Sequence, residues 1–257
     1  MKILAVSSEK GGVAKTTISV HLAHAAYDKG LKVLLVDFDT QGNAGMMFEP
    51  PDLSKTFLST AVLFDEKPSN MPIEFVKPNF GIIRADKEAL TMVADSKTEG
   101  AEFRPLEALK QHANSFDICI VDSAPSRAFL LYSSLVLADY VLTPVKMGKF
   151  ELDGFAELIG DITNIQKSGI NPRIKHLGSI PVKINTRSSK QMEMLSEFKS
   201  TYKKSVLDLC LPEREAVQVA INEGRPVWSN VRGASHKKTA IEWRDACEAI
   251  LNMVIKG

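Results

Sequence analysis

Cysteine is scarce in this chain, and its pattern argues against a metal site built from thiolates. The three cysteines, Cys119, Cys210 and Cys247, are odd in number and lie far apart. None of them has the spacing of a metal-binding motif. Cys119 lies within a short apolar run, so we expect it to be a core thiol. A core of this size needs no disulfide bonds, and such cysteine usage is typical of a reducing cytoplasm.

Long apolar runs are also missing. The sequence begins with a short apolar run at residues 1–6, which is too short for the core of a signal peptide and leads directly into a glycine-rich loop. No stretch approaches the roughly 20 apolar residues that a membrane-spanning helix needs. Internal repeats, low-complexity stretches and linkers are absent as well. The sequence therefore predicts a single soluble, cytoplasmic domain over residues 1–257.

The net charge of +1 conceals an uneven distribution. Residues 173–257 contain 15 Lys and Arg against 9 Asp and Glu, a net charge of +6, which leaves residues 1–172 at −5. Such asymmetry can mark a face that binds nucleic acid or an anionic membrane, or it can reflect an ordinary solvated surface. The charge counts alone leave these alternatives open.

Short apolar runs alternate with helical patterns along the chain. Strands buried on both faces read as continuous apolar runs, and strand–helix alternation is typical of a doubly wound sheet. We therefore expect an α/β fold whose mostly parallel sheet carries helices on both faces. Residues 42–102 hold several prolines and are expected to form short helices and one strand. The expected strands are 2–6, 32–36, 80–84, 118–121, 140–144 and 177–182, and the expected helices are 16–29, 106–113, 130–138, 155–165, 190–202, 213–222 and 237–254.

A glycine-rich loop follows the first strand and opens the first helix. It reads Lys10-Gly11-Gly12-Val13-Ala14-Lys15-Thr16-Thr17. In this setting, backbone N–H groups and the positive end of the helix can surround phosphate oxygens, and glycines let the backbone approach closely. We expect Lys15 to neutralise the β- and γ-phosphates of a nucleotide and the Thr16 hydroxyl to bind Mg²⁺.

This loop resembles that of the ParA/MinD/Soj family of deviant Walker ATPases, which reads KGGxGKTT. The generic phosphate loop starts with glycine where this chain has Glu9, and the extra lysine, Lys10, is the family's signature. The resemblance implies that Lys10 reaches across an ATP-bound homodimer to the partner's nucleotide phosphates. Ala14 departs from the family, which usually has glycine there. A near-helical backbone would accept alanine at little cost, whereas another conformation would impair nucleotide binding or turnover.

Two further segments place carboxylates at strand ends. The stretch from Asp37 through Asp39 to Asn43 resembles the family's DxDPQGN, with Thr40 replacing proline. The resemblance implies that Asp39 orients the attacking water and that Asp37 supports Mg²⁺ or the loop. Asp122, followed by residues 123–126, resembles Walker B and switch II, so Asp122 is expected to hold Mg²⁺ through water and the switch to sense the γ-phosphate. Carboxylates at this edge of a parallel sheet lie where ligands bind, although an Asp that only caps a turn remains the alternative.

The resemblance continues into the C-terminal half. Residues 183–187 are similar to the segment whose asparagine contacts adenine, which is Asn185 here. An amide offers the base edge both a donor and an acceptor, and a turn asparagine is the alternative. Residues 211–214 and 223–227 resemble the late segment that helps frame the nucleotide and the DNA face.

Taken together, the resemblance implies a partition or cargo-positioning ATPase that uses ATP and Mg²⁺. Such a protein forms a homodimer with ATP, holds non-specific DNA, and hydrolyses ATP when a ParB-like or cargo-adaptor protein stimulates it. No N-terminal helix-turn-helix domain is expected, and the expected location is cytoplasmic and nucleoid-associated. Lys and Arg contacts to phosphate give affinity without base readout. The candidate DNA contacts are Arg187, Arg214, Arg225, Arg232, Lys237 and Lys238.

Two other functions compete with this one. A MinD-type membrane switch needs a basic amphipathic helix, but the apolar residues of 237–254 have the spacing of a helix packed on the sheet, and its acidic residues would repel anionic lipid. No membrane partner is therefore expected. An iron–sulfur reductase would need cysteines near the switch loops, where this chain has none. The cluster Met46-Met47-Phe48 is expected to serve core or dimer packing, with a partner groove as the alternative.

Overall fold

The computed structural model describes residues 1–96, 98–125, 129–185 and 187–257. Eight strands form one sheet in the order β3-β4-β2-β5-β1-β6-β7-β8. All neighbouring strands pair in parallel except β3 and β4, which are antiparallel. The strands are β1 Lys2–Val6, β2 Val33–Asp37, β3 Glu74–Lys77, β4 Phe80–Ile83, β5 Ile118–Asp122, β6 Tyr140–Val145, β7 Lys175–Ile184 and β8 Leu211–Pro212.

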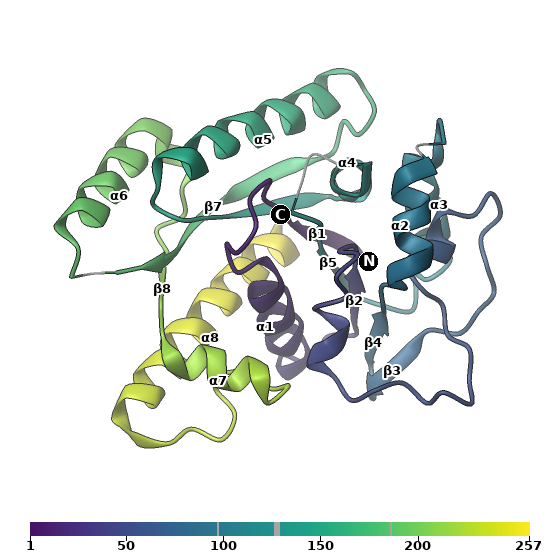
Figure 1. Ribbon diagram of the computed structural model, residues 1–257, viewed down its shortest axis with the longest axis horizontal. Coiled ribbons are helices and arrows are strands. Elements are labelled where there is room, and N and C mark those ends of the chain that lie inside the picture. Colours follow the sequence, from purple (N-terminus) through teal and green to yellow (C-terminus); the bar gives the residue numbers. More distant parts are fainter. Residues whose placement is uncertain (97, 126–128, 186) are drawn as a thin grey trace.

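Helices cover both faces of this sheet (Figure 1). The α-helices are α1 Lys15–Asp28, α2 Lys87–Ser96, α3 Arg104–Lys110, α4 Phe129–Leu137, α5 Lys149–Lys167, α6 Ser189–Tyr202, α7 Glu215–Asn222 and α8 Gly233–Lys256. Short 3₁₀ turns are η1 Gly45–Met47, η2 Ala61–Phe64, η3 Ala101–Phe103 and η4 Lys203–Ser205. The predicted doubly wound α/β fold is confirmed.

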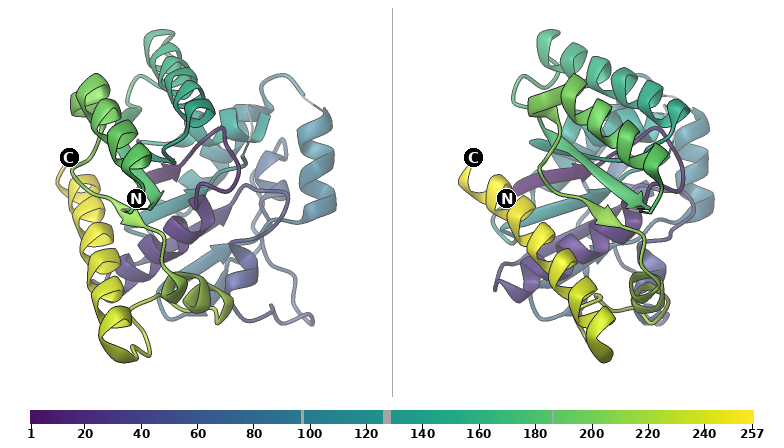
Figure 2. Two further views of the ribbon diagram at one scale, coloured as in Figure 1. Left: turned by 60° about the vertical axis from the view of Figure 1, so that its left-hand side comes forward. Right: turned by 90° about the vertical axis from the view of Figure 1, so that its left-hand side faces the viewer.

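The central strand β1 shows how the sheet separates two cores. Leu4 and Val6 pack into the cluster that contains α1, α7 and α8, whereas Ile3 and Ala5 pack into the cluster that contains α2 to α5. Because side chains alternate across a strand, an apolar strand such as this one supplies both layers. Figure 2 shows α8 (yellow) and α5 (teal) on opposite sides of the sheet.

Helix α8 packs onto the sheet as its sequence spacing predicts. Its apolar residues Trp243, Cys247, Ile250, Leu251 and Val254 are all buried. They join the same core cluster as α1 and β1. Within the described part of the chain, no helix combines the length and apolarity needed to cross a membrane.

The structure adds elements that the sequence pattern did not indicate. Residues 74–77 form β3, an antiparallel edge strand, whereas η1, η2 and α2 lie within residues 42–102, where short helices were expected. The sequence Glu-Phe-Val-Lys is too short and too mixed to stand out as a strand, and it is paired on one side only. The two-residue strand β8 is likewise below what periodicity can detect.

Candidate functional site

The fold brings the sequence-predicted motifs to one edge of the sheet. Strands β2, β5 and β1 are neighbours, and Asp122 at the end of β5 is in register with both Asp37 of β2 and Val6 of β1. The glycine-rich loop follows β1 directly and leads into α1 at Lys15. The two carboxylates therefore lie beside the loop, at the carboxyl ends of parallel strands, where α/β proteins bind ligands.

Lys15 is buried at the start of α1, and its ammonium faces inward across the loop. Its Nζ donates a hydrogen bond to the carbonyl oxygen of Lys10 at 3.1 Å. Burial lowers the pKa of Lys15, while the charges of Asp122 and Asp39 oppose that fall. The side chain is thus a buried cation that is hydrogen-bonded to one carbonyl oxygen and lies in the field of two carboxylates. An anion placed in the loop would compete for it strongly.

The loop itself has the form of a phosphate cradle. A Cβ on Gly11 would meet nothing within 4 Å, so open space lies in front of the backbone there. Gly12 has φ of +68°, a conformation that glycine adopts without strain. A Cβ on Gly12 would lie 3.8 Å from the Nζ of Lys146, a residue that directly follows β6.

Asp122 has the environment of a metal-supporting carboxylate. Its Oδ1 accepts a hydrogen bond from the Ser19 hydroxyl at 3.1 Å, and the Thr16 hydroxyl lies near enough to affect its pKa. Its Oδ2 is buried and has no hydrogen-bond partner among the residues that the structure describes. Burial raises the pKa of Asp122, and the hydroxyls of Thr16 and Ser19 and the charge of Lys15 oppose the rise. A buried carboxylate oxygen without a partner, beside a threonine hydroxyl, fits the oxygen ligands that Mg²⁺ prefers.

Asp37 is occupied by the backbone that follows it. Its Oδ1 accepts from the backbone N–H of Asp39 at 3.1 Å, and its Oδ2 accepts from those of Ala44 and Gly45 at 2.9 and 3.1 Å. Burial, followed by the charge of Asp122, raises the pKa of Asp37. These contacts show Asp37 fixing the loop, and a role at Mg²⁺ remains a prediction. Asp39 is also buried, and its Oδ1 accepts from the N–H of Gln41 at 3.0 Å.

Ala14 has φ of 63° and ψ of 26°, which is the left-handed region. The sequence left open whether the backbone at Ala14 is near-helical or not, and the structure shows the conformation that is strained for alanine. A non-glycine residue in this region costs about 1–2 kcal/mol. The carbonyl of Ala14 accepts the N–H of Ile18 at 2.9 Å at the start of α1, so this backbone begins the helix.

Lys10 lies against α5. A Cβ on Gly154 would come within 3.0 Å of the Cε of Lys10, so glycine at this position makes room for the lysine stem. No sequence pattern had pointed to Gly154 as a site residue. Lys146 was also not predicted as a site residue. It follows β6 at the same sheet edge, so the rule that ligands bind at the carboxyl ends of parallel strands, which pointed to Asp37 and Asp122, applies to it as well.

A cavity of about 350 Å³ adjoins the phosphate loop and could hold a nucleoside. Ala14 and Thr17 line one side of it, Lys183 and Pro212 another, and Trp243 of α8 also lines it. Lys183 has φ of 53°, so this cavity is bordered by two non-glycine residues in the left-handed region. Such strained positions concentrate at ligand sites.

Asn185 lies outside that cavity and lines a neighbouring one of about 590 Å³. It is exposed, and its Oδ1 accepts the backbone N–H of Arg187 at 3.0 Å, which is the geometry of a turn asparagine. Contact between Asn185 and adenine remains a prediction. Thr186, and residues 126–128 of the expected switch II, fall outside the described residues.

The six candidate DNA contacts gather around α7 and the start of α8. Arg187, Arg214 and Lys238 line the 590 Å³ cavity, while Arg225 and Arg232 line an adjacent one that also includes Arg214. Lys237 lines a third, shallower hollow on α8. Three of these residues are paired internally: Arg225 with Glu223 at 2.5 Å, and Arg214 and Lys238 with Glu242 at 3.8 and 3.9 Å.

Hydrogen bonds connect the phosphate loop with this basic region. The Nδ1 of His21 lies 2.7 Å from the carbonyl oxygen of Thr17, and its Nε2 accepts the N–H of Val227 at 3.1 Å. The ring therefore carries its proton on Nδ1. The carbonyl of Val227 in turn lies 2.7 Å from the Nε2 of His236, whose Nδ1 accepts the N–H of Arg232 at 3.1 Å.

Known proteins are similar to this chain in both sequence and fold. The model of the AAA domain family AAA_31 matches residues 1–176. Protein IncC of Escherichia coli is 30% identical over 244 residues, which cover 93% of this chain and 66% of IncC. The sporulation initiation inhibitor protein Soj of Bacillus subtilis is 29% identical over 236 residues, covering 88% of this chain and 90% of Soj. This chain thus spans about two thirds of the length of IncC and most of Soj.

A solved structure of similar fold is cobyrinic acid a,c-diamide synthase from Mycobacterium smegmatis, with bound ADP and magnesium. It is 25% identical, superimposes with a TM-score of 0.77, and the match covers 98% of this chain and 94% of the synthase. The family model covers more than half of the chain and includes the loop and both carboxylate-bearing strands. The chain belongs to the AAA domain family and, within it, is a ParA-type deviant Walker ATPase.

Proposed function

We propose that this protein, acting as one ATPase domain over residues 1–257, is an ATP-dependent dimerising switch. It positions or partitions a cargo such as a plasmid, a chromosome origin or a protein body. The observation that carries the proposal is the convergence of Lys10, Lys15, Asp39 and Asp122 on one sheet edge around an open glycine loop. The chromosome partitioning protein ParA of Myxococcus xanthus, which is 28% identical over 228 residues that cover 88% of this chain and 80% of that protein, supports the same class of activity.

In the proposed site, residues 10–17 bind the phosphates of ATP. The Lys15 ammonium exchanges the Lys10 carbonyl for phosphate oxygens, which are stronger acceptors because they are charged. Thr16 and the unpartnered oxygen of Asp122 hold Mg²⁺, with Asp37 supporting from the loop; when bound, Mg²⁺ neutralises charge on the phosphates. Asp39 positions the attacking water. Ala14, Thr17 and the cavity they line, with Asn185 nearby, hold the nucleoside.

Lys10 is proposed to act in the partner subunit's site. In the single chain its stem lies against Gly154, and its backbone carbonyl accepts the bond from Lys15. Release of that carbonyl upon phosphate binding frees the loop end that carries Lys10. ATP binding and dimer formation are therefore coupled at this residue.

The proposed dimer holds non-specific DNA through the basic region around α7 and α8, in the cytoplasm and on the nucleoid. Phosphate contacts need positive charge rather than base readout. Arg187, Arg232 and Lys237 are the stronger candidates, because Arg214, Arg225 and Lys238 already face carboxylates. A ParB-like or cargo-adaptor protein would stimulate hydrolysis.

Turnover and self-association of matched variants test this proposal. With ATP and Mg²⁺, the wild-type chain should dimerise and hydrolyse slowly. Lys15→Ala should lose nucleotide binding, Lys10→Ala should bind nucleotide without dimerising, and Asp39→Ala should dimerise without turnover. Hydrolysis by Asp39→Ala at the wild-type rate would show that another group positions the water.

A further inference from the structure

Lys146 is a third lysine at the phosphate loop, beside Lys10 and Lys15. It directly follows β6. Among the described residues, and apart from the chain neighbours of Gly12, its Nζ is the only atom that a Cβ on Gly12 would meet within 4 Å, at 3.8 Å. We propose that the Lys146 ammonium binds the phosphate chain of the nucleotide held by the loop of its own subunit. This role rests on the proposed function, because it belongs to the same nucleotide site.

Strand β6 carries Lys146 past the end of β1 and alongside the loop. The last register pair between the two parallel strands joins Val6 to Leu142. Strand β6 continues to Val145, which is paired with Pro181 of β7. It therefore extends beyond β1 on the side where β1 gives way to the loop, and β7 supports it there. Lys146 comes next in the chain, so its side chain starts from a supported backbone beside the loop.

The residues on either side of Lys146 anchor it. Val145 is 2% exposed and Met147 is 7% exposed, and both belong to an apolar cluster that includes Phe155 of α5. The N–H of Gly148 also donates to the carbonyl of Lys146 at 3.1 Å. Lys146 itself is half-buried. Because its backbone is already fixed, this lysine loses less conformational freedom on binding a ligand than a lysine on a mobile loop would lose.

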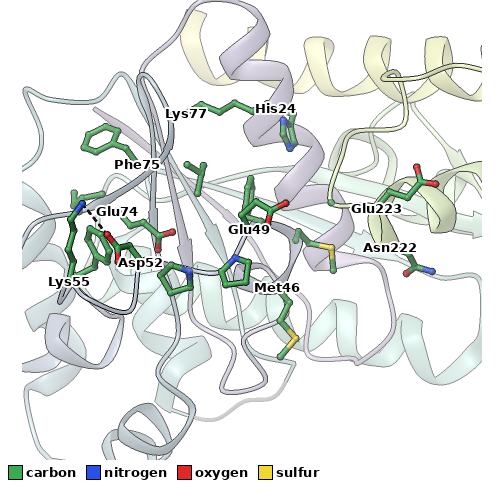
Figure 3. A pocket seen from close by; sticks show the side chains of 18 residues that line it. His24, Met46, Glu49, Asp52, Lys55, Glu74, Phe75, Lys77, Asn222 and Glu223 are labelled. Carbon is green, nitrogen blue, oxygen red and sulfur yellow. Dashed lines mark ion pairs between the residues drawn. The ribbon is translucent and has the colours of Figure 1, made fainter.

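The Lys146 ammonium has no ion pair or hydrogen bond with the residues that the structure describes. Other lysines of the chain have carboxylate partners. Lys55 pairs with Asp52 at 3.2 Å in the hollow beside β3 (Figure 3), and Lys199 pairs with Asp208 at 3.0 Å. A half-buried ammonium without a counter-charge is available to an anion, and hydrogen bonds between charged groups are the strong ones. The anions for which the adjacent loop has the form of a cradle are phosphates.

Lys15 and Lys146 reach the loop from different elements. Lys15 begins α1, and its Nζ lies inside the loop at the carbonyl of Lys10. Lys146 comes from β6 and lies next to Gly12. The stem of Lys10 lies against Gly154 of α5, which leaves Lys146 as the second cation of this subunit's own site. A phosphate chain carries charge along its length, so two cations placed by separate elements stabilise it more than one.

Displacement of a fluorescent ADP analogue measures this contact. The competitors are ADP, ATP and inorganic pyrophosphate, all with Mg²⁺. Lys146→Gln replaces the ammonium with a neutral amide and should weaken the binding of all three by about tenfold, the value expected for one hydrogen bond between charged groups. Pyrophosphate has neither base nor sugar, so a loss of its affinity arises at the phosphate site. Lys146→Arg keeps the charge and should retain most of the affinity.

Lys87 provides the matched control. It begins α2 shortly after β4, at the same edge of the sheet, and it is exposed. Lys87→Gln makes the same change in net charge and should leave the affinity for all three competitors unchanged. Thermal melts check the fold of both variants. The melting temperature of Lys146→Gln should stay within about 2 °C of that of the wild type, because the substitution breaks no contact between described residues.

Two results would overturn the role of Lys146. The first is unchanged binding of ADP and pyrophosphate by Lys146→Gln; if ATP-dependent dimerisation fell at the same time, the lysine would act at the partner's nucleotide instead. The second is an equal loss in Lys87→Gln, which would show a general effect of charge.

ATP turnover of the wild-type chain is measured separately. A chain that binds all three ligands through Lys146 and never hydrolyses ATP would count against the proposed ATPase function and leave the role of Lys146 standing. A wild-type chain that binds none of the three would overturn both.

Discussion

The alanine in the phosphate loop gives a prediction whose size follows from its backbone. Ala14 sits at φ 63° and ψ 26°, where a Cβ costs about 1–2 kcal/mol. Glycine removes that cost, but its greater conformational freedom stabilises the unfolded chain by about 0.4–1 kcal/mol. Ala14→Gly should therefore raise the free energy of unfolding by about 1 kcal/mol. For a chain of 257 residues this corresponds to a rise in melting temperature of about 2–4 °C.

Urea denaturation of the nucleotide-free protein measures this difference. Ala94→Gly is the matched control, since Ala94 lies within α2 and glycine there should lower stability by about 1 kcal/mol. In contrast to the impairment expected from the sequence for such a backbone, nucleotide affinity of Ala14→Gly should stay within about threefold of wild type, because the loop already has the conformation that glycine would adopt. A loss of stability in Ala14→Gly comparable to that in the control would refute the strained conformation at residue 14.

Three further predictions concern the surroundings of the site. Gly154→Ala should stabilise α5 by up to about 1 kcal/mol through helix propensity, yet it should weaken ATP-dependent dimerisation because the new Cβ displaces the Lys10 stem. Denaturation measures the first effect and light scattering the second. Unchanged dimerisation would rule out this placement of Lys10. The folded protein binds the proton of Asp37 more tightly than the unfolded chain does, because the pKa of Asp37 is raised from 3.8 to about 8. The nucleotide-free protein should therefore lose stability as the pH rises from 3.8 towards about 8. Asp37→Asn should flatten this pH dependence of the free energy of unfolding in denaturation curves, and an unaltered pH dependence would contradict the raised pKa of Asp37. His21→Phe leaves the buried N–H of Val227 without its acceptor and should lower the free energy of unfolding by about 1–3 kcal/mol. An unchanged melting temperature would show that the hydrogen bond between Val227 and His21 contributes nothing to stability.

Much of the sheet could be predicted because its strands are continuous apolar runs. The strand at 33–37 and the strand at 118–122 lie within one residue of their predicted bounds, and both end in the predicted carboxylate. The sheet-edge rule then places Asp37, Asp122 and the loop together without knowledge of side-chain positions. Edge strand β3 escaped prediction because its burial is one-sided and its four residues are too few to show a period.

The details of the site depend on contacts between residues distant in sequence. The stem of Lys10 meets Gly154 across 144 positions, and His21 meets Val227 across 206. No local pattern signals either pairing. The conformation of Ala14 was also open, since the residue type alone permits a helical or a left-handed backbone and only the folded loop selects between them. Asn185 accepts the backbone N–H of Arg187 as a turn asparagine does, and its contact with adenine stays a prediction.

The central claim is that ATP controls DNA binding by this chain, and retention of a non-specific DNA duplex tests it most directly. The measurement compares no nucleotide, ADP, ATP and a slowly hydrolysed ATP analogue, with Lys10→Ala as the variant that cannot link two subunits. We predict salt-sensitive retention with the two triphosphates only, and its loss in Lys10→Ala. Retention that is equal in all four states, or absent from all of them while ATP still binds, would contradict the account and favour a membrane-bound or purely protein-bound member of the same family.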